Sequence, residues 1–114
     1  MYILVTYIPP SHLEVVKAAL FSAGAGKIGA YDQCCFQILG EGQFRPLEGS
    51  TPYIGTRDEL ARGAEWRLEL AVEDSVVNAV LTAVLESYPY EVPPYHLIPV
   101  VTREDLKEHP WQRQ

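Results

Sequence analysis

The chain has 114 residues, of which 47% are hydrophobic and 21% charged, and its net charge is -6. These values are ordinary for a folded protein, and the length suits one domain over residues 1–114. The acidic balance argues against non-specific nucleic-acid binding and against an anionic membrane surface, which both need clustered Lys and Arg. We find no transmembrane-length apolar run and no leader pattern, so we expect a cytoplasmic location.

The first half of the chain predicts a strand, a helix and a second strand. Residues 2–8 are β-branched and aromatic without polar alternation, which favours a central strand that Pro9 ends. A second strand is expected from about Gln33 to Leu39, then a turn or bulge at Gly40-Glu41-Gly42 and a short returning strand around residues 44–47. The helix between the strands is indicated by apolar residues at helical spacing: Leu13, Val16, Leu20 and Phe21.

The second half begins with a long connection. Residues 47–63 are rich in Gly, Pro, Ser and Thr, and one helical turn is expected at residues 56–61. Residues 65–72 then alternate, with apolar side chains on one face and charged ones on the other, so they predict a half-buried strand.

The last third of the chain predicts a second helix and an edge strand. Asp74 or Ser75 should cap the helix, which the residue before Pro89 should end. The proline-rich run over residues 90–101 is typical of a strand at a sheet edge. Thr102 and Asp105 predict a short terminal helix, stopped by Pro110. The order describes an α+β fold, the ferredoxin-like βαββαβ sandwich, with an antiparallel sheet and two helices on one face.

Gly24, Gly26 and Gly29 have the G-x-G-x-x-G spacing of dinucleotide-binding loops. In such loops a strand precedes the glycines and a helix follows, whereas here the order is reversed. We therefore interpret the segment as a structural turn in which at least one of the three glycines has a positive φ.

Cys34 and Cys35 are adjacent, so in a strand their side chains would point to opposite faces and an ordinary disulfide between them is disfavoured. We expect one buried thiol and one accessible thiol. Cys34 is expected to be the buried one, because it would share a face with Phe36 and Ile38.

The run from Gly24 through Cys34 to Phe36, followed by Gly40-x-Gly42-x-Phe44-x-Pro46, resembles the PII-like or CutA-like domain inserted in YqfO proteins, which are relatives of the NGG-interacting factor. Some of those proteins carry a GTP cyclohydrolase label, and their host domain supplies the ligands of a two-metal site. We expect this chain to stand alone without that domain, so the resemblance implies no enzymatic activity. It also implies a homo-oligomer, first a trimer and next a dimer. The segment Tyr88-Pro89-Tyr90-Glu91-Val92 departs from the family's His-Pro-Tyr-Glu-Glu.

Three functions follow as hypotheses, none of which needs a cofactor. The first is a non-enzymatic, oligomer-forming regulatory or interaction module, against the alternative of a monomer whose second sheet face is polar. The second is a sensor that binds a small molecule, anion or nucleotide between subunits, and the third is a divalent-metal module. The candidate interface residues are Arg67, Glu69, Tyr90 and Tyr95; the candidate ligand residues are Gly24, Gly26, Lys27, Gly29 and Arg45; the candidate metal ligands are Cys34, Cys35, Glu41 and His96.

Overall fold

The computed structural model of this protein describes residues 1–107. Pro110, expected to stop the last helix, lies outside them. None of the helices in the described part has the length and hydropathy to cross a membrane. The elements are β1 (Tyr2–Ile8), α1 (Leu13–Ser22), β2 (Phe36–Phe44), β3 (Ala61–Val72), α2 (Val77–Ser87), β4 (Tyr95–Pro99) and α3 (Arg103–Lys107), with 3-10 helices at Pro10–His12 and Asp74–Val76 before α1 and α2.

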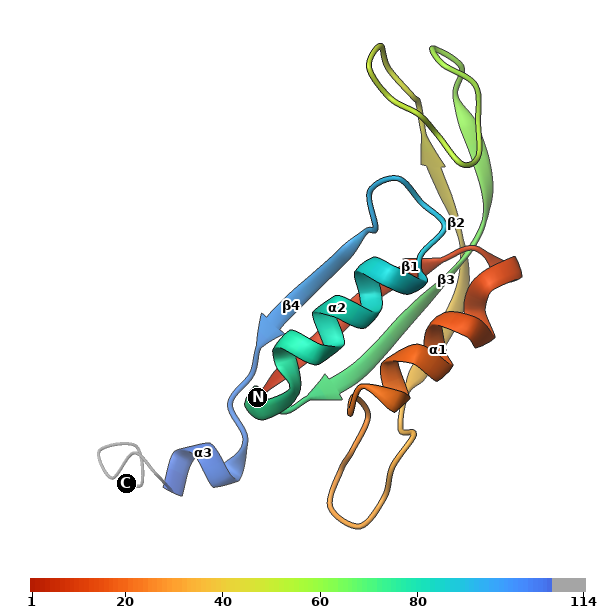
Figure 1. Ribbon diagram of the computed structural model, residues 1–114. Coiled ribbons are helices and arrows are strands. Elements are labelled where there is room, and N and C mark those ends of the chain that lie inside the picture. The colour runs from red at the N-terminus through yellow and green to blue at the C-terminus, as the bar shows by residue number, and fades with distance from the viewer. Residues whose placement is uncertain (108–114) are drawn as a thin grey trace.

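The four strands form one antiparallel sheet in the order β2-β3-β1-β4, and α1 and α2 lie side by side across one of its faces (Figure 1). This is the predicted α+β ferredoxin-like arrangement. As expected, β1 is central and the proline-flanked β4 is an edge strand; β2 forms the other edge. Among residues 1–107, no helix covers the second face of the sheet.

The core lies between the helices and the sheet. Leu4 and Ile8 of β1, Leu68 of β3, and the apolar stripes of the two helices are buried there. The stripes are those that the helical spacing predicts: Leu13, Val16 and Leu20 in α1, and Val80 and Val84 in α2. Helix formation thus depends on burying one face of each helix against the sheet.

The ends of the helices agree only in part with the sequence prediction. Gly24 follows α1 with φ +109°, which confirms that a glycine closes the helix in the left-handed region. Neither Asp74 nor Ser75 caps α2, because the cap positions carry no side-chain hydrogen bond; Asp74 instead pairs with the N-terminal amine at 2.8 Å. The Thr102–Asp105 cap of α3 is confirmed, with the Thr102 N–H donating to the Asp105 carboxylate at 2.7 Å.

The hairpin of β2 and β3 differs most from the prediction. Gly40-Glu41-Gly42 lies inside β2, not at a turn, and β2 pairs directly with β3 without a returning strand. β3 begins at Ala61, and residues 56–59 form a simple turn with a hydrogen bond from Glu59 N–H to the Thr56 carbonyl at 3.0 Å. Glycine is compatible with both a turn and a strand interior, so the sequence alone does not distinguish the two. Pairing with β3 makes this segment part of a strand. β4 is also shorter than the predicted run.

Candidate functional site

The face opposite α1 and α2, which we call the open face, is formed by alternate residues of all four strands. The register aligns Phe36 of β2 with Glu69 of β3, Val5 of β1 and His96 of β4, and the row beside it contains Ile38, Arg67 and Tyr7. The third row contains Ala71, Ile3 and Ile98. The open face is therefore mostly apolar, with two opposite charges near its middle.

Several apolar side chains of the open face are largely accessible. Phe36 is 61% exposed, Ile38 50% and Ile98 44%, while Val5 between them is only 3% exposed. A sheet face that stays in water normally carries polar residues at such positions. Large apolar residues that adjoin one another on an exposed surface mark a contact site more often than a solvated one.

Arg67 and Glu69 form an ion pair across the middle of the open face, with 2.8 Å between Arg67 Nε and Glu69 Oε1. Arg67 also donates from Nη1 to the Tyr7 hydroxyl at 3.0 Å, and its guanidinium lies 5.8 Å from the centre of the Tyr7 ring. The hydrogen bond to Glu69 raises the pKa of Arg67 above its already high value. These contacts hold both charges in the plane of the face.

The hairpin of β2 and β3 extends beyond the rest of the sheet, as Figure 1 shows. β1 pairs with β3 only from Trp66 onward, so Gly40–Phe44 and Ala61–Glu65 form a ribbon of two strands. We call this ribbon, with the connecting residues 45–60, the arm. Two strands without a third or a covering helix are marginally stable in water. The exposed apolar side chains of the arm are Phe44, Leu47, Tyr53, Ile54 and Leu60.

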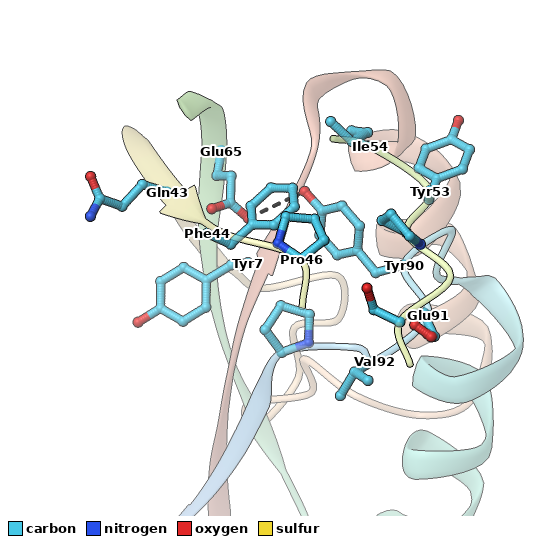
Figure 2. Close-up of a pocket in the computed structure, with 13 residues that line it drawn as sticks. Tyr7, Gln43, Phe44, Pro46, Tyr53, Ile54, Glu65, Tyr90, Glu91 and Val92 are labelled. Atoms are coloured by element: carbon cyan, nitrogen blue, oxygen red, sulfur yellow. Dashed lines mark hydrogen bonds between the residues drawn. The ribbon is translucent and has the colours of Figure 1, made fainter. Parts of the chain in front are cut away.

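A cavity of about 350 Å³ lies where the base of the arm meets the segment between α2 and β4; we call it the arm-base pocket (Figure 2). Rings from four parts of the chain line it, namely Tyr7, Phe44, Tyr53 and Tyr90, together with several prolines. Two carboxylates, Glu65 and Glu91, also line it. Aromatic walls with a few polar groups are typical of small-molecule pockets.

Hydrogen bonds fix both carboxylates of the arm-base pocket. Both oxygens of Glu91 accept from the Thr51 N–H, at 2.8 and 2.9 Å, which ties the arm to the segment before β4. The Tyr90 hydroxyl donates to Glu65 Oε2 at 3.3 Å. Burial, and then the nearby Glu65 charge, raise the pKa of Tyr90, so its phenol remains protonated as a donor. Gly42 leaves room for the Glu65 carboxylate, which a Cβ at this position would overlap.

One polar group of β1 points toward the helices rather than to the open face. Thr6 is fully buried; its hydroxyl donates to the Pro94 carbonyl at 2.9 Å and shares a hydrogen bond with the Tyr88 hydroxyl. These bonds hold the segment after α2 against β1. Burial raises the pKa of Tyr88, against the opposing effect of the Thr6 hydrogen bond.

The structure does not gather the candidate anion-binding residues. The N–H groups of Gly24, Gly26 and Ile28 already donate to the carbonyls of Phe21, Ala71 and Tyr31 at 2.8 to 3.0 Å. Gly24, Gly26 and Gly29 all have positive φ, as predicted for a turn. Lys27 lies in this loop, whereas Arg45 follows the far end of β2, roughly 26 Å away along a nine-residue strand. These N–H groups are thus unavailable to an anion.

The candidate metal ligands are also dispersed. Cys34 and Cys35 precede β2, Glu41 lies in β2, and His96 lies in β4 at the opposite edge of the sheet. Within residues 1–107 we find no group of three or more His, Cys, Asp or Glu side chains placed to hold a metal ion. One chain therefore does not assemble these four residues into a site.

The prediction that Cys34 is the buried cysteine is wrong. Both cysteines are half-buried, and Cys35 is the one that packs against the core. The prediction assumed that Phe36 and Ile38, which share a face with Cys34, are buried. They lie on the open face instead, because they pair with Glu69 and Arg67. The Cys34 thiol instead makes a weak contact with the Asp32 carbonyl at 3.6 Å.

The four candidate interface residues occupy three places. Arg67 and Glu69 lie on the open face and Tyr90 lines the arm-base pocket. Tyr95 packs against the core and is not part of the open face. Sequence reasoning missed the apolar residues around the charge pair: Ile3, Val5, Phe36, Ile38 and Ile98. The signal was present in β1, whose lack of alternation already indicated apolar side chains on both faces.

No family model matches the chain. It is 45% identical over 97 residues to a Bacillus subtilis protein named GTP cyclohydrolase 1 type 2 homolog, covering 85% of this chain and 26% of that protein. A protein of the same name from Mycobacterium leprae is 39% identical over 97 residues, covering 85% and 25%. The chain spans about a quarter of the length of these curated relatives.

Solved structures agree with this relation. A Bacillus cereus protein related to NIF3 superposes with a TM-score of 0.77 at 35% identity, covering 89% of this chain and 26% of that one. The PII-like protein CutA from Nostoc superposes with a TM-score of 0.65 at 20% identity, covering 96% and 89%. The resemblance seen in the sequence is confirmed: one segment of the NIF3-related proteins matches this chain, and the fold is that of CutA.

Proposed function

Because the chain has the CutA-like fold and is related to one segment of the YqfO and NIF3-related proteins, we propose that it is a non-catalytic domain that self-associates and serves interaction or regulation. The cyclohydrolase name belongs to proteins of which this chain covers only about a quarter. We therefore assign none of that chemistry to these residues.

The open face is the observation that carries this proposal. Phe36, Ile38 and Ile98 are exposed around a nearly buried Val5, which is the composition of a surface that another protein covers. The Arg67–Glu69 pair favours a second copy as the occupant. Two opposite charges side by side on one face can meet the same pair on a symmetry-related copy with complementary signs.

The arm supports the same occupant. β2 is an edge strand of nine residues, FQILGEGQF, with one charge and no proline. Natural sheets usually protect such an edge, because its free N–H and C=O groups pair readily with another chain. A neighbouring copy would cover both the ribbon and its apolar side chains. We propose a trimer first, from the resemblance to CutA, and a dimer next.

The test is the solution mass of the purified protein at micromolar concentration, by light scattering and native mass spectrometry. We expect one homo-oligomer. Ile38→Lys should shift the mass toward the monomer, because it buries a charge in the proposed interface. Val15→Lys is the matched control: Val15 is 59% exposed on α1, away from the open face, and this variant should keep the wild-type mass. A sharp monomer mass for the wild type would contradict the proposal.

A further inference from the structure

The arm-base pocket combines aromatic rings with uncompensated negative charge. Tyr7, Phe44, Tyr53 and Tyr90 contribute the rings, and Glu65 and Glu91 the charge. None of the described residues that line the pocket is a Lys, Arg or His. Within residues 1–107 neither carboxylate forms an ion pair. Arg67 is close to Tyr7 but is already paired with Glu69 at 2.8 Å.

This combination selects a particular ligand chemistry. The face of an aromatic ring attracts a cation, and the attraction grows when water is excluded. Carboxylates held by hydrogen bonds add charge-assisted contacts to an ammonium or guanidinium group. The two carboxylates would repel an anion. The apolar walls and the volume of about 350 Å³ suit a cation attached to an organic body rather than a bare metal ion.

We propose that the arm-base pocket is a binding site for a small organic cation, an ammonium or amidinium group carried on a flat or apolar body. Glu65 and Glu91 balance its charge, and the rings of Phe44, Tyr53 and Tyr90 enclose it. Because Glu91 also binds the Thr51 N–H of the arm, occupation of the pocket would order the arm against the segment before β4. All of these residues come from one chain.

Benzamidine is a suitable probe, and benzamide is its neutral isostere. Calorimetric titration of the 114-residue chain should show saturable benzamidine binding, with benzamide at least about tenfold weaker, the loss typical of one charge-assisted contact. Two-dimensional NMR should place the shifts at Thr51, Glu65 and Tyr90. Equal affinity for both compounds, or no binding of benzamidine, would overturn the proposal. So would tighter binding of a proline-rich peptide than of benzamidine.

Glu65→Gln keeps the size of the side chain and an acceptor for Tyr90, so it isolates the charge. It should weaken benzamidine binding about tenfold. Glu41→Gln makes the same change of net charge on β2 outside the pocket, and it should bind like the wild type. Equal weakening in both variants would reduce the effect to net charge and refute the site. The solution mass is measured on the same samples, so failure of ligand binding and failure of self-association are seen separately.

Discussion

The two faces of the sheet are built from alternate residues of the same strands, yet they differ in burial. In β1, Leu4 and Ile8 are fully buried under α1 and α2, whereas Ile3 and Tyr7 face the side without a helix. Both sets are apolar, so chemistry alone does not separate them. The difference is that, within the described residues, α1 and α2 cover only one of the two faces. We infer that the covered face determines stability and that the open face determines association.

The largest expected effect tests this division on two apolar residues of neighbouring strands. Leu68→Ala on the covered face should lower the free energy of unfolding by about 2–5 kcal/mol, because it leaves a cavity in a closed core. The loss should be the same at every protein concentration. Ile38→Ala on the open face should cost less, and its cost should grow with concentration as subunits associate. Urea unfolding over a range of concentrations measures both.

If Ile38→Ala lowers the free energy of unfolding as much as Leu68→Ala at high dilution, the open face also contributes to the stability of the single chain. That result would contradict the division between the two faces. Val15→Ala, at an exposed position on α1, provides the baseline for removing apolar atoms from the surface.

The next effect concerns the loop that closes one end of the covered layer. Gly26 has φ +79°, its N–H donates to the Ala71 carbonyl at 2.8 Å, and a Cβ on it would lie 2.7 Å from the Cys34 carbonyl oxygen. Gly26→Ala should therefore cost about 2 kcal/mol or more, from backbone strain and the close approach together. Gly29 has φ +56° but open space around it, so Gly29→Ala should cost only about 1 kcal/mol.

Thermal melts of the two alanine variants make this measurement, with and without NAD, ATP or GTP. We expect the nucleotides to change neither melting temperature, because the N–H groups of Gly24, Gly26 and Ile28 already donate to carbonyls of the chain. Micromolar nucleotide binding that disappears in a variant of unchanged stability would contradict the structural role of this loop.

The covered face was predictable from the sequence, for a physical reason. The helical stripes of α1 and α2 and the alternation of residues 65–72 are local periodicities, and each must bury its apolar side. The order of elements then leaves few topologies. The glycine that follows α1 was predictable for a similarly local reason, since only glycine adopts its left-handed conformation without strain.

The open face and the arm were less predictable because they depend on non-local pairing. In β2, residues 36–39 are apolar on both sides, apart from Gln37, so the pattern does not say which side faces the helices. The register with Arg67 and Glu69 decides it, and this register reversed the expected burial of Cys34. Gly42 reads as a turn residue in isolation, but it pairs with Gly63 inside the β2–β3 ribbon, and the Glu65 side chain occupies the space that a Cβ at Gly42 would need.

A smaller effect comes from the polar group on the covered face. Burial raises the pKa of Tyr88 in the folded protein, whereas an unfolded phenol ionises near about pH 10. Above that pH the unfolded state releases a proton that the folded state retains, so stability falls with rising pH, by up to about 1.4 kcal/mol per pH unit. Below it, this contribution is fully present.

Tyr88→Phe should reduce the alkaline loss of stability while costing about 1 kcal/mol at neutral pH through the lost bond to Thr6. Urea unfolding at a series of pH values from 7 to about 11 follows the two effects separately. Tyr31→Phe, at an exposed phenol, controls for the loss of a hydroxyl. An alkaline slope unchanged by Tyr88→Phe would show that burial of this phenol does not contribute.

The smallest expected effect is a difference in thiol reactivity between the adjacent residues Cys34 and Cys35. Cys35 packs against the core, whereas the Cys34 thiol makes an exposed contact with the Asp32 carbonyl. A thiol label should therefore modify Cys34 faster than Cys35 in the native protein, and modestly so because both are half-buried. Peptide mass mapping after short labelling gives the two rates, and Cys34→Ser and Cys35→Ser each give one rate alone. Faster labelling of Cys35 would place it outside the covered layer and move the boundary between the two faces.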